Sequence, residues 1–145
     1  AARAQHVDEI IRPALAQGNI VLCDRFYDAT TAYQGAGRGL DAEFLDTINH
    51  QSAGGLVPDL TLLLDLPAEI GLARARRRNV MLSMAAEGRF EEEELPFHDR
   101  VRSAYLQLAG TENRFKVIDA EKGKDQIVAQ IRETVQTFLN GHNRP

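Results

Sequence analysis

Three short apolar runs, separated by segments with helical spacing, most constrain the fold of this chain. The runs lie at 20–23 (IVLC), 60–66 (LTLLLDL) and 115–119 (FKVID). Continuously apolar strands that alternate with helices are typical of a parallel sheet covered by helices on both faces. We therefore predict an α/β fold in a single domain that spans residues 1–145.

Hydrophobic spacing and cap residues predict where the helices lie. Gly18 should stop the first helix and Pro13 should weaken or kink it. Asp41 should cap a later helix, and Pro67 suits the first position of the helix after the second strand. Residues 79–93 lack periodicity, which predicts a long mobile loop. The expected helices or helical turns span roughly 3–17, 28–35, 41–52, 67–78, 97–108 and 127–139.

Composition excludes several classes of protein. Hydrophobic residues make up 43% and charged residues 26%, and the net charge is −4, so the chain carries no general nucleic-acid or membrane surface. Cys23 is the single cysteine, which excludes a disulfide framework and favours a cytoplasmic location. The four histidines lack metal-ligand spacing, and no apolar run approaches the roughly 20 residues of a membrane span.

Charged residues follow each apolar run at the point where the strand should end. These are the pair Asp24-Arg25, then Asp65, then Asp119. Ligands bind at the carboxyl ends of parallel strands, so we expect a site there. Asp24 fits the carboxylate that helps hold Mg²⁺ after such a strand, although a turn or capping role explains many strand-end aspartates. Arg25 favours the ligand-binding interpretation because a guanidinium can bind a phosphate through two hydrogen bonds.

A second cationic cluster begins within the helix after the second strand. Arg74 and Arg78 are four residues apart and share a helix face. Arginines near a helix carboxyl end also complement the helix dipole, for about 0.3–1 kcal/mol each. An anionic ligand could balance this cluster, and so could the acidic run at 91–94. Charge alone leaves both interpretations open. The cluster comprises Arg74, Arg76, Arg77, Arg78 and Arg89.

Two glycine-containing stretches do not match phosphate-binding motifs. The stretch 35–39 (GAGRG) is followed by Leu40, so it is not G-x-G-x-x-G. Gly123-Lys124 is followed by aspartate and has isoleucine at position 118, so it is not a Walker A motif. The 145 residues contain no Walker A sequence at all.

The sequence resembles the bacterial thymidylate kinases from position 2 to about position 139. The family motif DR[YFH]-x-x-S-x-x-A-Y-Q-G appears at 24–35 as DRFYDATTAYQG. It is followed in family order by PDLTLLLDLP, GLARARRR, GRFE and KVIDA. The resemblance implies a three-layer αβα fold of the P-loop kinase type. It also implies transfer of the γ-phosphoryl group of ATP to deoxythymidine monophosphate (dTMP), giving the diphosphate.

The resemblance assigns a role to residues on the acceptor side. Arg25 matches the arginine that holds the phosphate of dTMP and takes part in catalysis. Arg3 matches the arginine that reaches a thymine carbonyl, and Thr30 matches a position that bonds the base edge. Tyr33 matches the tyrosine packed near the deoxyribose, which disfavours a 2′-hydroxyl. Gln34 belongs to the same motif and is expected to bind the substrate.

The resemblance likewise assigns residues to the metal, to the lid and to ATP. Asp24 matches the carboxylate that organises Mg²⁺ through water. Asp24, Arg78 and Arg89 are expected to be catalytic. Arg74, Arg78 and Arg89 lie in the region that the family uses as its lid, whose loop is expected at 79–93 and closes over the transferring group. The expected ATP-binding residues are Arg74, Arg78, Asp119, Ala120 and Glu121.

The chain departs from the family pattern in three places. Ala29 stands where the family usually has serine, and the stretch 79–88 is longer and more apolar than the usual lid. The first strand and its P-loop are absent, so we interpret the chain as the carboxyl-terminal portion of such a kinase. Without a Walker A lysine we expect it to be inactive alone.

Partners and alternatives also follow from the sequence. The family implies dTMP and ATP as ligands and a homodimer, and an exposed sheet edge predicts further self-association. Nucleic acid and membrane are not expected partners. Two alternatives stay open: a related nucleoside or deoxynucleoside monophosphate kinase, and a non-catalytic nucleotide-binding or dimerisation module.

Overall fold

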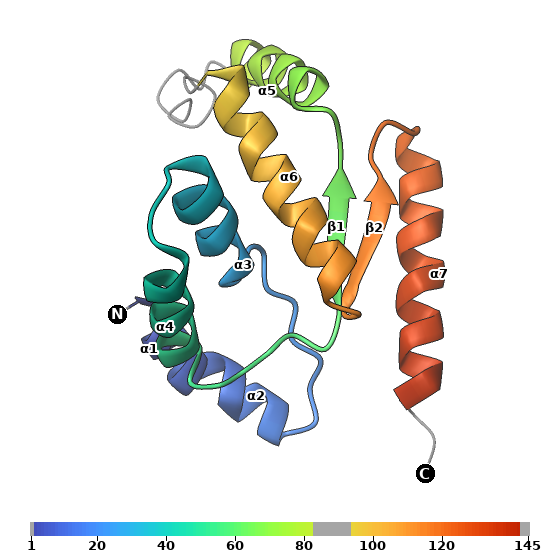
Figure 1. Cartoon of the computed structure of the whole chain (residues 1–145). Coiled ribbons are helices and arrows are strands. Elements are labelled where there is room, and N and C mark those ends of the chain that lie inside the picture. The colour runs from blue at the N-terminus through green and yellow to red at the C-terminus, as the bar shows by residue number, and fades with distance from the viewer. Residues whose placement is uncertain (1, 83–93, 143–145) are drawn as a thin grey trace. The chain divides into compact units, whose positions relative to one another are not determined.

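A computed structural model describes residues 2–82 and 94–142 of the chain. The residues divide into two compact units, Ala1–Val57 and Pro58–Pro145 (Figure 1). The expectation of a single domain stays a prediction. None of the helices in the described ranges is long and apolar enough to cross a membrane.

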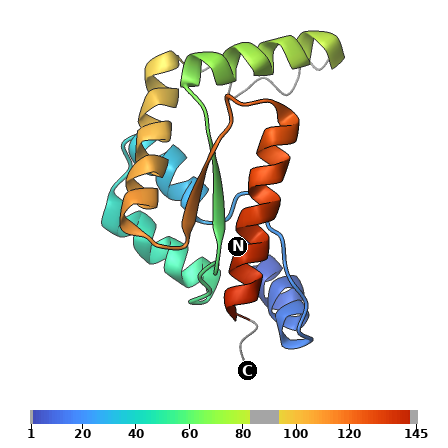
Figure 2. The ribbon, with the colours of Figure 1, turned by 90° about the vertical axis from the view of Figure 1, so that its right-hand side faces the viewer.

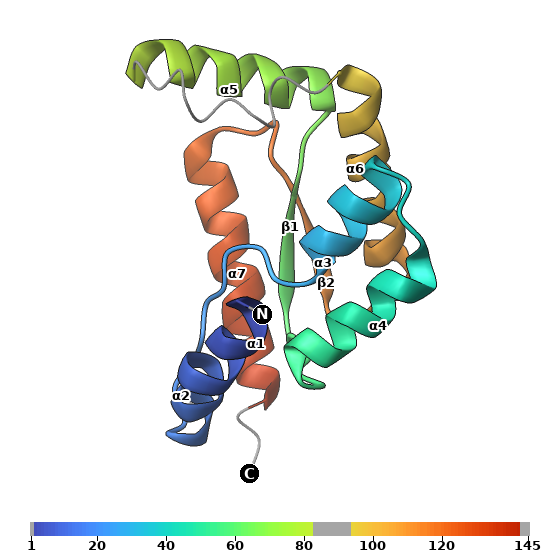
Figure 3. The ribbon, with the colours of Figure 1, turned by 90° about the vertical axis from the view of Figure 1, so that its left-hand side faces the viewer.

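The second unit is built on two parallel strands, β1 (Thr61–Asp65) and β2 (Phe115–Asp119). Thr61 pairs with Phe115, and the register runs on to Asp65 opposite Asp119. The strands lie between helix α6 (Leu95–Thr111) and helix α7 (Lys124–His142), as Figures 2 and 3 show. The predicted strands at 60–66 and 115–119, the two helices and the three-layer αβα arrangement are therefore confirmed in this unit.

The core of this unit contains buried side chains from α6 and from both faces of β2, because residues 115 and 118 point to opposite sides of the strand. Phe97, Val101 and Ala104 are buried at helical spacing on α6, and Phe115 and Ile118 are buried on β2. Ile118 is 1% exposed, and full burial of such a side chain contributes about 1.5–3 kcal/mol. This packing fixes β2, and with it the position at which the strand ends in Asp119.

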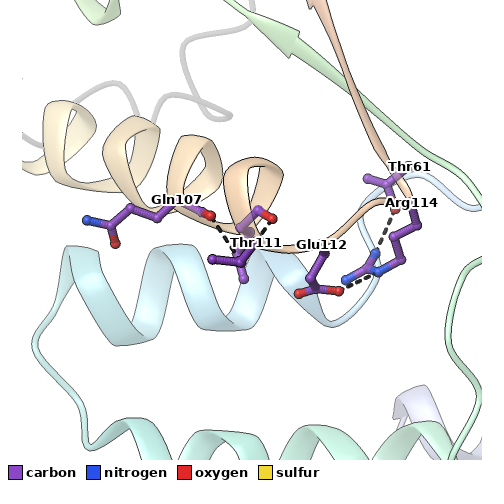
Figure 4. A network of polar contacts seen from close by, with 6 residues as sticks. Thr61, Gln107, Thr111, Glu112 and Arg114 are labelled. Atoms are coloured by element: carbon purple, nitrogen blue, oxygen red, sulfur yellow. Dashed lines mark hydrogen bonds and ion pairs between the residues drawn. The ribbon is translucent and has the colours of Figure 1, made fainter.

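The turn between α6 and β2 holds the amino-terminal ends of both strands (Figure 4). The Arg114 guanidinium donates to Glu112 Oε2 at 2.7 Å and to Thr61 Oγ1 at 2.7 Å. It also lies over the Phe115 ring, 4.5 Å from its centroid. Thr61 N donates to the Arg114 carbonyl at 2.8 Å, which continues the ladder. These bonds set the register at one end, so the opposite ends meet at Asp65 and Asp119.

Helix α5 (Ala68–Leu82) lies beyond the carboxyl ends of the strands in all three views (Figures 1 to 3). Pro67 immediately precedes it, within one residue of the predicted start. The helix includes residues 79–82, so the prediction of a loop from 79 onward is wrong for these four positions. Helix α5 continues through these positions, although their sequence has no apolar periodicity. The rest of the expected lid, 83–93 with Arg89, lies outside the described residues.

The first unit opens with a helical stretch in three parts. These are α1 (Ala2–His6), the π-helical segment η1 (Val7–Ile11) and α2 (Arg12–Ala16). The Arg12 N–H bonds the carbonyl of Val7, five residues earlier. This wider turn precedes Pro13, which lies in the first turn of α2 where its missing N–H costs little. Pro13 therefore changes the helical bonding without ending the helix, and Gly18 follows with a φ of 78°.

The remaining helices of this unit confirm two further predictions. Residues 28–35 lie in α3 (Asp28–Thr30) and the π-helical segment η2 (Thr31–Gly37). Helix α4 (Ala42–Ala53) begins after Asp41, whose Oδ1 accepts the Phe44 N–H at 2.8 Å. It ends at Gly54, which has a φ of 57°. The Arg12 guanidinium donates to the Gly54 carbonyl at 2.5 Å, which joins the two helical stretches.

The predicted buried strand at 20–23 is wrong for this structure. These residues form no ladder with another described segment, and Leu22 is 93% exposed. An apolar, β-branched run favours a strand only where a second backbone lies alongside it to pair. The two strands of the described ranges pair with each other. The expectation that Asp24 shares a sheet edge with Asp65 and Asp119 stays a prediction.

Candidate functional site

The turn at Asp24-Arg25 has an unusual backbone. Among the non-glycine residues of the described ranges, Arg25 alone has a positive φ, 61°. A side chain in this left-handed region costs about 1–3 kcal/mol, and such residues cluster at binding sites. Both side chains are exposed. The bend therefore presents a carboxylate and a guanidinium together to solvent, at the cost of local strain.

Arg25 lies against an aromatic ring from the following helix. Its guanidinium carbon is 4.4 Å from the centroid of the Tyr33 ring. Such a stacked contact is worth about 0.5–1 kcal/mol at exposed sites, and it limits where the guanidinium can point. Phe26 and Tyr27 also contact each other, with ring centroids 5.0 Å apart. The structure thus brings together Arg25 and Tyr33, two of the residues that the resemblance assigned to the acceptor.

Arg3 is the centre of a polar cluster in the first unit. Its Nη2 donates to Thr30 Oγ1 at 2.5 Å, and its Nη1 donates to Asn49 Oδ1 and Ser52 Oγ, both at 2.9 Å. Burial lowers the pKa of the Arg3 guanidinium, while the nearby Cys23 and Asp28 act in the opposite direction. Arginine stays charged at neutral pH despite such a shift. The predicted pair Arg3 and Thr30 is therefore in direct contact.

A pocket joins Arg3 to the Asp24-Arg25 turn. Arg3 also lies over the Phe26 ring, 5.9 Å from its centroid. The pocket thus combines two guanidinium groups, one carboxylate and one aromatic face, a set that suits a ligand with an anionic group and a flat ring. It is lined by Ala2, Arg3, His6, Cys23, Asp24, Arg25 and Phe26.

In this unit, the carboxylate of Asp24 is the candidate metal ligand. In the ranges that the structure describes, no three His, Cys, Asp or Glu side chains are grouped so that they could hold a metal ion. Asp24 lines the pocket beside Arg25. One carboxylate with waters and substrate phosphates is a usual environment for Mg²⁺, whereas a dedicated all-protein cage is not. The donor set at Asp24 therefore fits Mg²⁺ that binds together with a nucleotide.

The carboxyl ends of β1 and β2 form a second polar region, in the second unit. Arg74 Nη1 of α5 donates to the Ala120 carbonyl at 2.8 Å, and the Ala120 N–H donates to the Asp65 carbonyl at 2.9 Å. The Glu121 N–H donates to Asp119 Oδ1 at 2.9 Å, which closes a tight turn. Four of the five predicted ATP-binding residues, Arg74, Asp119, Ala120 and Glu121, are therefore close to one another.

Two further predicted residues lie on the helical segments η2 and α5. Gln34 is half-buried on η2, where its carbonyl accepts the Leu40 N–H at 3.0 Å. Arg78 lies exposed on α5, one turn beyond Arg74. Their roles stay predictions.

Three polar residues in these clusters do not follow from sequence reasoning. Asn49 and Ser52 reach Arg3 from α4, and Arg102 of α6 binds Asp65 through two bonds, at 2.7 and 2.8 Å. The hydrogen bonds from Arg102 hold the pKa of the Asp65 carboxyl below its ordinary value of 3.8. Asp65 is thus a partner of Arg102 at the strand end. Arg3 and Asn49 are 46 residues apart, and no local spacing rule connects residues so distant.

Comparison with known proteins finds one family along most of the chain. The family model described as thymidylate kinase matches residues 1–131. The thymidylate kinase of Desulfovibrio desulfuricans is 54% identical over 99% of this chain and 67% of its own length. Those of Syntrophotalea carbinolica (54% identical) and Solidesulfovibrio magneticus (56% identical) are matched over 97% and 96% of this chain, and over 65% and 68% of their own lengths. The chain thus spans about two thirds of the length of these relatives. The chain belongs to the thymidylate kinase family.

Proposed function

We propose that the parent protein transfers the γ-phosphoryl group of ATP to dTMP, and that this chain supplies its acceptor site and part of its donor site. The relatives that carry the name thymidylate kinase support the reaction. Catalysis of this kind depends mainly on positioning and on neutralising charge. Each site residue would therefore act by holding or neutralising one group of the substrates.

The base of dTMP would bind at Arg3 and Thr30. A guanidinium has five N–H donors, and the bonds to Thr30, Asn49 and Ser52 use three of them. Thymine presents carbonyl oxygens that accept such donors, and the hydroxyl of Thr30 can bond the same edge. The Phe26 ring beside Arg3 offers a flat apolar surface for the base.

The phosphate of dTMP would bind at Arg25. A guanidinium forms two parallel hydrogen bonds with a phosphate, and Tyr33 limits the directions available to this one. The left-handed backbone of Arg25 supports this role, since strain of that kind is kept where a site needs it. Tyr33 would then lie near the sugar, where its ring disfavours a 2′-hydroxyl.

Asp24 would hold Mg²⁺ through water, and the ion would neutralise charge on the phosphates. On the donor side, Arg74, Asp119, Ala120 and Glu121 would lie beside the adenine of ATP. Arg78, and Arg89 of the lid, would approach the transferring phosphoryl group. The contact of Arg74 with Ala120 supports a single donor surface formed by α5 and the turn after β2.

We further propose that the 145 residues alone do not transfer phosphate at a useful rate. They contain no Walker A sequence, whose backbone and lysine hold the donor phosphates in P-loop kinases. This feature favours a second candidate function, nucleotide binding without catalysis. An assay of diphosphate formation with this chain separates the two, because measurable turnover would contradict the proposed inactivity.

The contact between Arg3 and Thr30 is the observation that carries the proposal, since it joins two residues, 27 positions apart, that the family resemblance assigns to the same base. Calorimetric titration of the chain with dTMP tests it, with adenosine monophosphate as the control nucleotide. We expect binding of dTMP and at least tenfold weaker binding of the control. Equal affinities would favour a related monophosphate kinase, and no binding of either would contradict the acceptor site in this chain.

A further inference from the structure

Asn49 is the most buried polar residue of the first unit, and the function proposed above does not use it. Its side chain lies on α4 and is 4% exposed. Its Oδ1 accepts a hydrogen bond from Arg3 Nη1 at 2.9 Å, and its Nδ2 donates to Thr31 Oγ1 at 3.0 Å. A buried amide is retained at little cost only when both ends are bonded, and here both are.

The neighbours of Asn49 determine which way its amide points. A guanidinium can only donate, so it must face the amide oxygen, and the amide nitrogen is left for the hydroxyl of Thr31. The reverse orientation would place donors against donors. Asn49 therefore connects α1, which carries Arg3, with the segment that carries Thr30 and Thr31. Ser52, one turn further along α4, accepts from the same Nη1 of Arg3.

We propose that Asn49 is a positioning residue that fixes the direction of the Arg3 guanidinium and thereby sets base selectivity. This inference rests on the proposed function, in which Arg3 donates to a carbonyl of thymine. A long arginine side chain loses conformational entropy when a ligand orders it, and a residue that orders it beforehand removes part of that cost. Asn49 orders the donor without touching the base.

A fixed donor also discriminates between bases better than a mobile one. Thymine has a carbonyl acceptor at position 4 of the ring, and cytosine has an amino donor there. A guanidinium held in place opposes the cytosine amino group, whereas a loosened guanidinium can turn away from it. Loss of Asn49 should therefore weaken dTMP binding more than deoxycytidine monophosphate binding.

The test compares three variants of the full chain with the wild type. Asn49→Ala removes both bonds, and Asn49→Asp keeps an acceptor for Arg3. Leu45→Val is the matched control, because Leu45 is a buried residue of the same helix, 5% exposed, and its side chain is apolar. Calorimetry gives the affinities for dTMP and deoxycytidine monophosphate. Arginine side-chain NMR spectra of the ligand-free chain report whether the Nη groups of Arg3 are held or rotate.

We expect Asn49→Ala to weaken dTMP binding about 5–10-fold, to reduce the preference over deoxycytidine monophosphate, and to average the Arg3 Nη signals. Asn49→Asp should restore separate signals and most of the preference. Unchanged selectivity and unchanged Arg3 signals in Asn49→Ala would overturn the proposal, as would an equal loss in Leu45→Val.

The same experiments also cover a variant that does not fold and a wild-type chain that does not bind dTMP. If Asn49→Ala does not fold, Ser52→Ala removes the second acceptor of Nη1 with a smaller change in packing, and should give a weaker version of the same effects. If the wild-type chain does not bind dTMP, the proposed function fails. The spectra of the ligand-free chain still decide whether Asn49 holds Arg3.

Discussion

The two units hold their polar residues in different ways. In the first unit, Arg3 is fixed by the side chains of Thr30 from α3 and of Asn49 and Ser52 from α4. In the second unit, strand register places Asp65 opposite Asp119, and backbone carbonyls accept the surrounding N–H groups. One substitution can therefore disrupt the Arg3 cluster. The positions of Asp65 and Asp119 depend instead on the buried core that holds the two strands in register.

The largest effect is expected from the core of the second unit. Ile118→Ala removes a side chain that is 1% exposed, and should lower the free energy of unfolding by about 2–5 kcal/mol. The affinity of the first unit for dTMP should change little at temperatures where the variant is folded. Chemical denaturation and calorimetry measure the two quantities. Val117→Ala is the control on the same strand, at a position that is 45% exposed, and an equal loss of stability there would contradict the burial argument.

The second effect concerns Arg25, in the first unit. Arg25→Ala should weaken dTMP binding about 10–100-fold, because hydrogen bonds to a charged group contribute about 1.5–3 kcal/mol and each 1.4 kcal/mol is a factor of ten. Arg25→Gly should weaken binding equally, yet unfold with a free energy higher than Arg25→Ala by about 1 kcal/mol, since glycine accepts the φ of 61° without strain. Equal stability of the two variants would argue against strain at this position.

A third, smaller effect is a pH dependence of stability at the carboxyl end of β1. Arg102 holds the pKa of Asp65 below 3.8, so this pair stabilises the fold above that value and the contribution is lost as the pH falls through the lower folded pKa. Asp65→Asn should cost about 1–2 kcal/mol at pH 7, since solvent partly screens the pair. The difference from wild type should shrink toward pH 2. Denaturation curves across this range test it, with the exposed Asp59→Asn as control. A difference that stays constant down to pH 2 would exclude the ion pair as its cause.

The smallest effect is expected at the helix that carries Asn49. Asp41→Ala removes the cap of α4 and should reduce stability by about 1 kcal/mol, while Asp41→Asn should retain most of it. The melting temperatures of the two variants measure this. If the cap also orders the site, dTMP affinity would fall in Asp41→Ala. We expect it to stay constant, because Arg3 is held from the opposite end of α4.

Sequence reasoning succeeds where local periodicity and burial coincide. The run 115–119 is apolar and short, and it forms β2 with the predicted bounds. Helix α4 follows its aspartate cap, and α7 follows its apolar spacing. In each case one local rule, a cap or a repeat, determines the element. The shared region of Arg74 and 119–121 is expected from the family resemblance instead, and Arg74 of α5 donates to the Ala120 carbonyl.

Sequence reasoning fails where a partner distant in the chain decides the outcome. The run 20–23 has strand composition, yet no described strand pairs with it. Pro13 predicts a kink, whereas the helix responds with the wider turn of η1, which requires only a change in bonding. Asn49 has no periodic or motif signal, because its contacts with Arg3 and Thr31 form only in the folded chain.

The most direct test of the account is an NMR titration of the full chain, in which backbone amide signals are followed as dTMP and then ATP are added. We predict that dTMP shifts signals around Arg3, Arg25 and Thr30, in the unit that side-chain contacts fix. ATP should shift signals at Arg74 and 119–121, in the unit that strand register fixes. Shifts from dTMP confined to the second unit, with Arg3 and Thr30 unchanged, would contradict the proposed acceptor site.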